Sequence, residues 1–214
     1  MGYDWYVRER MAGVAEVFYP AENCRFTTHI LRELHQWTDA LKLYEVDIVH
    51  WNAGLWDTVR IYGDTNLVSP ATYAENIDRI CRRIEFLFPG AAQIFATSTP
   101  VMEEGYIPGF ETRTNRDVED YNEIARKTLA GRAEINDLYD LLRDCHRQYH
   151  SDQTHFYTKK GTVLIGERVC AALCAALGVS KDELKPVDMD SYQPILSVPD
   201  REAYAARGRF FVLK

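Results

Sequence analysis

The sequence predicts an α/β protein in which helices cover both faces of a parallel sheet. Short apolar runs alternate with amphipathic helical segments along the chain, and this alternation is typical of β-α-β units. One of the runs, Val46 to Trp51, contains three β-branched residues, as a strand buried on both faces requires. No internal repeat, low-complexity run or Gly/Ser linker divides the sequence, so we expect one domain.

The individual elements follow from apolar spacing and from residues that stop or cap them. We expect four strands, at residues 15–19, 46–51, 92–97 and 133–135. We expect five helices, at residues 3–11, 27–43, 69–88, 115–129 and 158–177. Ser69 and Pro70 have the residue types of an N-cap and a first helical turn. Gly178 closes the last helix, and Pro20 ends the first strand.

Composition narrows the class of protein without naming a function. The 214 residues carry a net charge of −7, and 46% of them are apolar. These values exclude a collagen, a disordered tail and a disulfide mini-protein. The acidic balance argues against a nucleic-acid partner, which needs a concentrated basic patch. The longest apolar stretch, about residues 169–179, is far shorter than the roughly 20 residues of a membrane span.

The N-terminus and the cysteines predict the cellular location of the protein and the redox state of its thiols. The first residues show no basic segment followed by an apolar one, so no signal peptide is visible. The five cysteines have no paired spacing, so we expect reduced thiols and a cytoplasmic protein. No feature specifies an oligomeric state.

The loops that follow the strands are where a parallel sheet places reactive groups. The last of them contains Asp152 and His155, three residues apart and just before the final helix. The Asp152 carboxylate would fix the tautomer of the imidazole, and His155 would take a proton from a nucleophile. The alternative interpretation is an N-capping aspartate and an ordinary loop histidine.

A second polar block follows the strand at residues 46–51. Asn52 offers an amide donor at the tip of this strand, and Gly54 allows a tight backbone turn. Such donors stabilise an oxyanion when they are held rigidly. The alternative is a plain strand-end turn. Ser98 also follows a strand but lacks the glycines of a nucleophile elbow. We expect the charged residues between 103 and 117 to form a solvated loop.

Together these blocks resemble the SGNH (GDSL-type) hydrolase family over about residues 1–177. Residues 151–161 resemble its D-x-x-H block, and residues 49–57 resemble its G-x-N-D block. The resemblance implies that Asp152 and His155 are the catalytic acid and base. It implies that Asn52, Gly54 and Asn23 lie at the oxyanion or substrate site.

The resemblance also implies a fold and a substrate class. The fold is a flavodoxin-like three-layer α/β/α sandwich with five parallel strands. The substrate is a small-molecule ester, including acylated carbohydrates, and neither a cofactor nor a metal is needed. Cys145, His146 and His150 lie close to the D-x-x-H block, but their spacing matches no compact zinc signature.

The chain departs from the family pattern in three places. The family nucleophile is the serine of a Gly-Asp-Ser block after the first strand, and no such block exists here. Trp56 occupies the position of the asparagine in G-x-N-D, and the loop at residues 20–28 contains no glycine. Residues 1–3 resemble the segment that follows the nucleophile, so the first strand and the serine are missing from the front. One explanation is a gene product that starts upstream of Met1.

The chain continues beyond the family resemblance at its other end. We therefore divide it into an SGNH hydrolase-like domain at residues 1–178 and an extension at residues 179–214 that packs on the same domain. Residues 210–213 form an apolar run that is suited to a buried parallel strand. It is a candidate to replace the first strand, which in the family lies between the second and third. The alternative is an edge strand or a docked tail.

Two functions therefore follow from the sequence. The first is an SGNH-type serine esterase whose nucleophile lies outside the 214 residues. The second is a catalytically inactive SGNH-like domain that serves as a binding module or scaffold.

Overall fold

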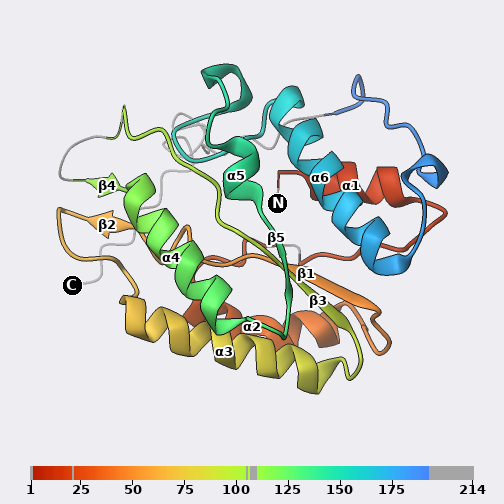
Figure 1. Cartoon of the computed structure of the whole chain (residues 1–214), viewed down its shortest axis with the longest axis horizontal. Coiled ribbons are helices and arrows are strands. Elements are labelled where there is room, and N and C mark those ends of the chain that lie inside the picture. Colours follow the sequence, from red (N-terminus) through yellow and green to blue (C-terminus); the bar gives the residue numbers. More distant parts are fainter. Residues whose placement is uncertain (1, 21, 105, 107–109, 193–214) are drawn as a thin grey trace, which may run out of the picture.

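The computed structural model describes residues 2–20, 22–104, 106 and 110–192. Three parallel strands form its central sheet in the order β1-β3-β5, and Figure 1 shows helices on both sides of this sheet. The strands are β1 (Ile48–Trp51), β3 (Ala92–Ala96) and β5 (Glu134–Asn136). The α/β class and the parallel sheet are confirmed.

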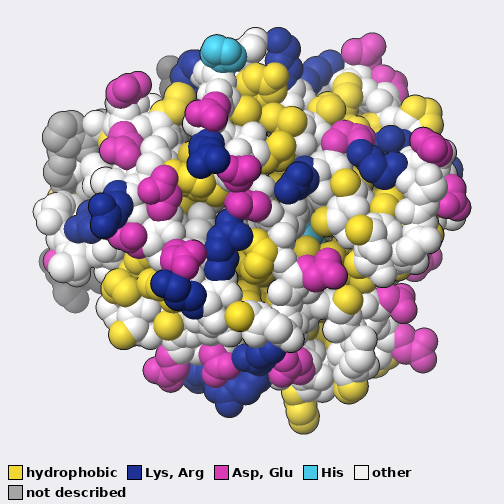
Figure 2. All heavy atoms as spheres, viewed as in Figure 1, with side chains coloured by type: hydrophobic (Ala, Val, Ile, Leu, Met, Phe, Trp, Pro, Cys, Tyr) yellow, Lys and Arg dark blue, Asp and Glu magenta, His cyan; other side chains and the backbone are white. Residues whose placement is uncertain are grey.

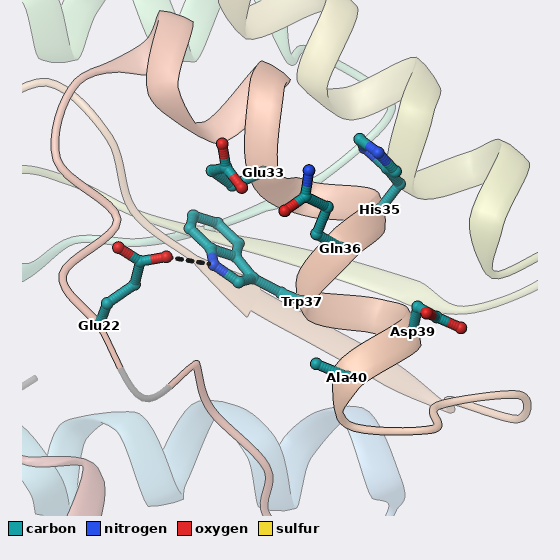
Figure 3. Close-up of a pocket in the computed structure, with 7 residues that line it drawn as sticks. All are labelled: Glu22, Glu33, His35, Gln36, Trp37, Asp39 and Ala40. Carbon is teal, nitrogen blue, oxygen red and sulfur yellow. Dashed lines mark hydrogen bonds between the residues drawn. The ribbon is translucent and has the colours of Figure 1, made fainter.

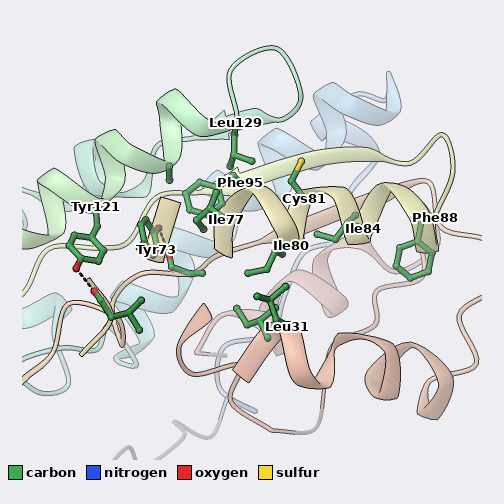
Figure 4. Packing of buried hydrophobic residues seen from close by; sticks show 14 residues of the cluster. Leu31, Tyr73, Ile77, Ile80, Cys81, Ile84, Phe88, Phe95, Tyr121 and Leu129 are labelled. Atoms are coloured by element: carbon green, nitrogen blue, oxygen red, sulfur yellow. Dashed lines mark hydrogen bonds between the residues drawn. The ribbon is translucent and has the colours of Figure 1, made fainter. Parts of the chain in front are cut away.

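The helices form two layers, each with its own apolar core. One layer packs on the core that contains Phe95 of β3 and consists of α2 (Thr27–Ala40), α3 (Pro70–Leu87) and α4 (Asn115–Thr128). Figure 4 shows this core from close by. The other layer consists of α1 (Asp4–Met11), α5 (Leu138–Leu142) and α6 (Lys159–Leu177). Two short 3-10 helices, η1 (Arg147–Tyr149) and η2 (Lys181–Glu183), flank α6 in the sequence.

The residues at the predicted helix ends act as caps. The Ser69 hydroxyl accepts the backbone N–H of Thr72 at 3.2 Å, and the Thr158 hydroxyl accepts that of Gly161 at 3.1 Å. Gly178 ends α6 with a φ of 68°, a conformation that glycine adopts without strain. Short-range signals therefore located these ends correctly.

The strand expected at residues 15–19 is absent, and this prediction was wrong. These residues form no strand, and the described part of the sheet has three strands instead of five. A strand needs a neighbour to accept its backbone hydrogen bonds. Among the described residues, no strand lies beside this segment to do so. An isolated segment with strand composition therefore stays irregular.

A small antiparallel ribbon joins two of the loops and was not predicted. It pairs β2 (Arg60–Ile61) with β4 (Glu111–Thr112). The Arg60 guanidinium makes two hydrogen bonds of 2.9 Å to the Asp117 carboxylate, which ties the ribbon to the first turn of α4. Strands of two residues are too short for a periodic pattern, so the sequence could not reveal them.

The surface of the face in Figure 2 mixes charges of both signs. Basic and acidic side chains alternate over this face instead of separating into patches. The ion pairs of the described residues include Arg126 with Asp137 at 2.6 Å. Among the described residues, no helix combines the length and the apolarity that crossing a membrane demands.

Asp57 connects the loop after β1 to the start of α2. Its carboxylate accepts the backbone N–H of Thr27 at 3.0 Å and the Thr27 hydroxyl at 2.5 Å. The side chain is fully buried. Burial raises the pKa of Asp57 to about 6, although the bonds from Thr27 oppose this shift.

The raised pKa of Asp57 predicts a pH-dependent stability. Between about pH 4 and pH 6 the folded state keeps a proton that the unfolded chain releases, so the free energy of unfolding falls as the pH rises. We expect Asp57 to contribute a fall of about 3 kcal/mol across this window, at 1.36 kcal/mol per pKa unit. Urea unfolding of the native chain and of Asp57→Asn, from pH 4 to pH 7, measures the difference. Asp39→Asn, an exposed change on α2, is the control, and a pH-independent difference for Asp57→Asn would contradict the prediction.

Candidate active site

Asp152 and His155 lie in a tight turn just before α6. One carboxylate oxygen of Asp152 accepts the backbone N–H groups of Thr154 and His155, both at 2.8 Å. The Nδ1 atom of His155 lies 3.0 and 2.9 Å from the two carboxylate oxygens. The His155 carbonyl accepts the Ser151 N–H at 2.8 Å and closes the turn. The turn therefore holds the carboxylate and the imidazole together.

This geometry selects one form of the imidazole. A carboxylate at Nδ1 favours the tautomer with the proton on Nδ1, which leaves Nε2 as the proton acceptor. The His155 ring stacks on Tyr157, with centroids 4.7 Å apart and an interplanar angle of 24°. Burial raises the pKa of Tyr157 to about 12, so its hydroxyl stays neutral.

The front of the described chain packs directly behind Tyr157. A Cβ atom on Gly2 would lie 2.1 Å from the ring of Tyr157, so the backbone at Gly2 approaches more closely than any other residue type allows. Residues 2–3 and the D-x-x-H turn are therefore neighbours, although about 150 residues separate them in the sequence.

The loop after β3 also contacts the turn. The hydroxyl groups of Tyr106 and Thr154 are 3.0 Å apart, and the Met102 N–H donates to the Gln153 carbonyl at 2.8 Å. These contacts tie the loop after β3 to the D-x-x-H turn.

Asn52 and Gly54 lie where β1 meets the end of β3. The Asn52 side chain is exposed, and its amide donates to the Ala96 carbonyl at 2.7 Å. Gly54 has a φ of 138°, and a Cβ atom there would lie 2.8 Å from the Ser98 hydroxyl oxygen. Gly54 is therefore required for both its backbone conformation and its close packing. The amide of Asn52 uses one of its two hydrogens on a neighbouring strand.

Asn23 and Ser98 have local structural partners. The Asn23 side-chain oxygen accepts the Arg25 N–H at 2.8 Å, which forms a turn. Ser98 is buried, with its hydroxyl 3.4 Å from the Ala53 carbonyl and its N–H 2.8 Å from the Asn122 side-chain oxygen. Ser98 is therefore enclosed in the core and does not face the solvent.

Arg113 was missed by the sequence reasoning, which assigned it to a solvated loop. Only 5% of Arg113 is exposed. Its guanidinium donates to the Leu55 carbonyl and to the Glu111 carboxylate, both at 2.7 Å, and lies 5.9 Å from the ring of Trp56. Arg113 thus braces the loop that carries Gly54. A single arginine among charged neighbours offers no sequence signal for this role.

An open cavity of about 550 Å³ lies elsewhere, on α2 and the segment before it. Figure 3 shows Glu22, Glu33 and Trp37 on its wall, with the Trp37 indole N–H bonded to Glu22 at 3.0 Å. None of the predicted site residues lines this cavity. Among the described residues, no three His, Cys, Asp or Glu side chains are grouped so as to hold a metal ion.

Comparisons with known proteins agree with this architecture. No family model matches the sequence, and no curated protein matches it. Solved structures do match. A Streptococcus pneumoniae protein superposes with a TM-score of 0.64 and 18% identity, covering 80% of this chain and 79% of the other.

Two further matches are structures of enzymes. One is a catalytic mutant of an acetylxylan esterase from Geobacillus stearothermophilus, with a TM-score of 0.59 and 12% identity. The match covers 85% of this chain and 83% of the other. The other is a GDSL-like lipase from Bacteroides thetaiotaomicron, with a TM-score of 0.54 and 16% identity. The match covers 71% of this chain and 72% of the other. At these identities the likeness establishes the fold.

Proposed function

Because the chain has the fold of the SGNH (GDSL-type) hydrolases, we propose that it forms the body of a serine esterase. The pair of Asp152 and His155 carries the proposal, since the carboxylate contacts Nδ1 and leaves Nε2 to act. The nucleophile is a serine that precedes Met1 and lies outside the 214 residues, which contain no Gly-Asp-Ser block. The close packing of Gly2 behind Tyr157 supports this position.

The chemistry is acyl transfer in two steps. His155 Nε2 takes the proton of the serine hydroxyl as its oxygen attacks the ester carbonyl, and the imidazolium then gives that proton to the leaving alcohol. Water hydrolyses the acyl-enzyme by the same proton path. Asp152 keeps His155 in the reactive tautomer and stabilises its cation. The second N–H of Asn52, with backbone N–H groups near Gly54 and Asn23, would bind the oxyanion.

The substrate class is a small ester, including acylated carbohydrates. The acetylxylan esterase among the structural matches supports this class. Trp56 lies partly exposed on the loop after β1, with 38% of its surface accessible. An exposed aromatic ring offers an apolar face against which the ring of a sugar can pack.

The second candidate is an inactive binding or scaffold domain. The absence of Gly-Asp-Ser from the sequence favours it, as does the burial of Ser98. The two candidates differ in whether the pair retains a catalytic partner.

The test supplies the nucleophile. Gly-Asp-Ser is joined to the N-terminal side of Met1, with zero to three intervening glycines, and the hydrolysis of p-nitrophenyl acetate is measured. We expect hydrolysis above that of the 214-residue chain, and a fall of about 10²- to 10⁴-fold when His155→Ala removes the general base. His146→Ala, a change of an exposed histidine, controls for hydrolysis by surface imidazoles. If correctly folded extended chains hydrolyse the ester no faster, and His155→Ala changes nothing, the inactive domain is the right assignment.

A further inference from the structure

Within the described part of the chain, β1 is paired along one of its two edges. It forms a parallel ladder with β3 over Ile48 to Trp51, and no described strand pairs with its other edge. All four residues of β1 are half-buried, whereas β3 is buried from Gln93 to Ala96. The apolar and β-branched composition of β1 is typical of a buried strand, so its residues are more exposed than their composition predicts.

The side chains of β1 already have partners on both faces of the sheet. Trp51 packs edge-on against Phe95, with centroids 4.9 Å apart. His50 points toward β5, with its Nε2 atom 3.2 Å from the Asn136 side-chain nitrogen. Among the described residues, no strand supplies a backbone partner to the second edge of β1. An open edge of this kind leaves N–H and C=O groups unpaired and invites association with any extended chain.

We propose that residues 210–213 of this chain add to the open edge of β1 as a fourth parallel strand. These residues lie outside the described part of the structure, and they form a continuous apolar run, Phe210 to Leu213. An apolar run of four matches the four residues of β1 in length. Parallel strands that lie between helix layers are buried, and residues 210–213 have the composition that such burial requires.

The length of the connecting chain permits this pairing. Tyr192 is anchored where α1 and α6 begin: its ring lies 5.6 Å from that of Trp5, and its hydroxyl lies 2.8 Å from that of Thr162. Residues 193–209 follow and number 17, so they span up to about 56 Å when extended. Because β1 is only about 13 Å long, the chain can pass to the amino end of the sheet and enter parallel to β1.

The pairing adds a strand but no nucleophile, because residues 210–214 contain no serine. A serine joined directly before Met1 needs no strand of its own, so this pairing and the proposed esterase are compatible in the extended chain. A parallel strand would bring Lys214 to the edge of the sheet at which the site lies. Hydrogen exchange in the 214-residue chain tests the pairing without that serine, so a failure of the pairing and a failure of the proposed esterase are distinguishable.

Residue-resolved amide hydrogen exchange tests the pairing on the full chain. Alternate residues of a parallel strand direct their N–H groups to opposite edges, so two of the four β1 amides point away from β3. We expect these two amides to be protected in the full chain and to exchange about tenfold faster in Val212→Pro, which cannot donate to a ladder. Ala205→Pro is the matched control, and we expect it to leave them protected.

A chain that ends at residue 209 gives the same test without a proline, so a folding defect in Val212→Pro does not decide the matter. Three results would overturn the proposal. The first is free exchange of the outward β1 amides in the full chain, and the second is equal protection of these amides in both altered chains. The third is protection that rises with protein concentration together with a dimer in sedimentation, which would assign the edge to a second copy.

Discussion

In the chain extended with Gly-Asp-Ser, Asp152→Asn is expected to lower kcat by about 10³- to 10⁴-fold. The asparagine oxygen can still accept the backbone N–H groups of Thr154 and His155, which Asp152 now binds at 2.8 Å. Its NH₂ group would face Nδ1 of the imidazole, so the proton moves to Nε2 and the base is lost. The turn should therefore survive while the chemistry fails.

A spectroscopic measurement checks the cause on the 214-residue chain itself. Nitrogen-15 NMR distinguishes a proton on Nδ1 of His155 from one on Nε2, and we expect the tautomer to change in Asp152→Asn. Asp144→Asn, an exposed change in the preceding segment, should alter neither the tautomer nor the rate. An unchanged tautomer in Asp152→Asn would show that the carboxylate does not control the imidazole.

Gly161→Ala should damage both stability and activity. A Cβ atom at this position would lie 2.5 Å from the carbonyl oxygens of Phe156 and Tyr149. Both are backbone atoms, so the segment that carries Asp152 and His155 must move away from α6. We expect a loss of about 2–3 kcal/mol in the free energy of unfolding, typical of overpacking. A displacement of His155 by about 1 Å would cost roughly 10²-fold in rate.

Urea unfolding and hydrolysis by the extended chain measure the two effects of Gly161→Ala. The control is Lys160→Ala, which changes the adjacent exposed residue of the same helical turn. An unaltered midpoint together with an unaltered rate in Gly161→Ala would mean that the turn adapts without strain.

The helices that the sequence predicted well are those whose ends have chemical markers. Ser69 and Pro70 begin α3, and Thr158 and Gly178 enclose α6. These markers act within one helical turn, so they do not depend on the rest of the fold. The parallel sheet was predicted from a different signal, the alternation of apolar runs and helical segments along the chain.

At residues 15–19 the local sequence pattern predicts the wrong structure. Their composition predicts a strand, but a strand exists only when another strand accepts its hydrogen bonds. Whether a neighbouring strand is present depends on the tertiary fold, and no pattern within five residues reveals it. The ribbon of β2 and β4 is a second case, because its partners come from two distant loops.

In the candidate site, too, the short-range contacts could be predicted from the sequence and the long-range contacts could not. The contact between Asp152 and His155 follows from a spacing of three residues, and the sequence could suggest it. The bond from Asn52 to Ala96 and the bracing of Leu55 by Arg113 join segments 44 and 58 residues apart. Such contacts depend on how β1 and β3 align, which the sequence pattern does not specify.

The D-x-x-H turn has a consequence for folding. The contacts that hold it together, from Ser151 to Tyr157, span at most six residues, and contacts of low sequence separation form early and fast. Asp152 and His155 can therefore adopt their arrangement before the sheet assembles. The serine that we propose comes from the opposite end of the chain, so its approach to this pair is a long-range encounter.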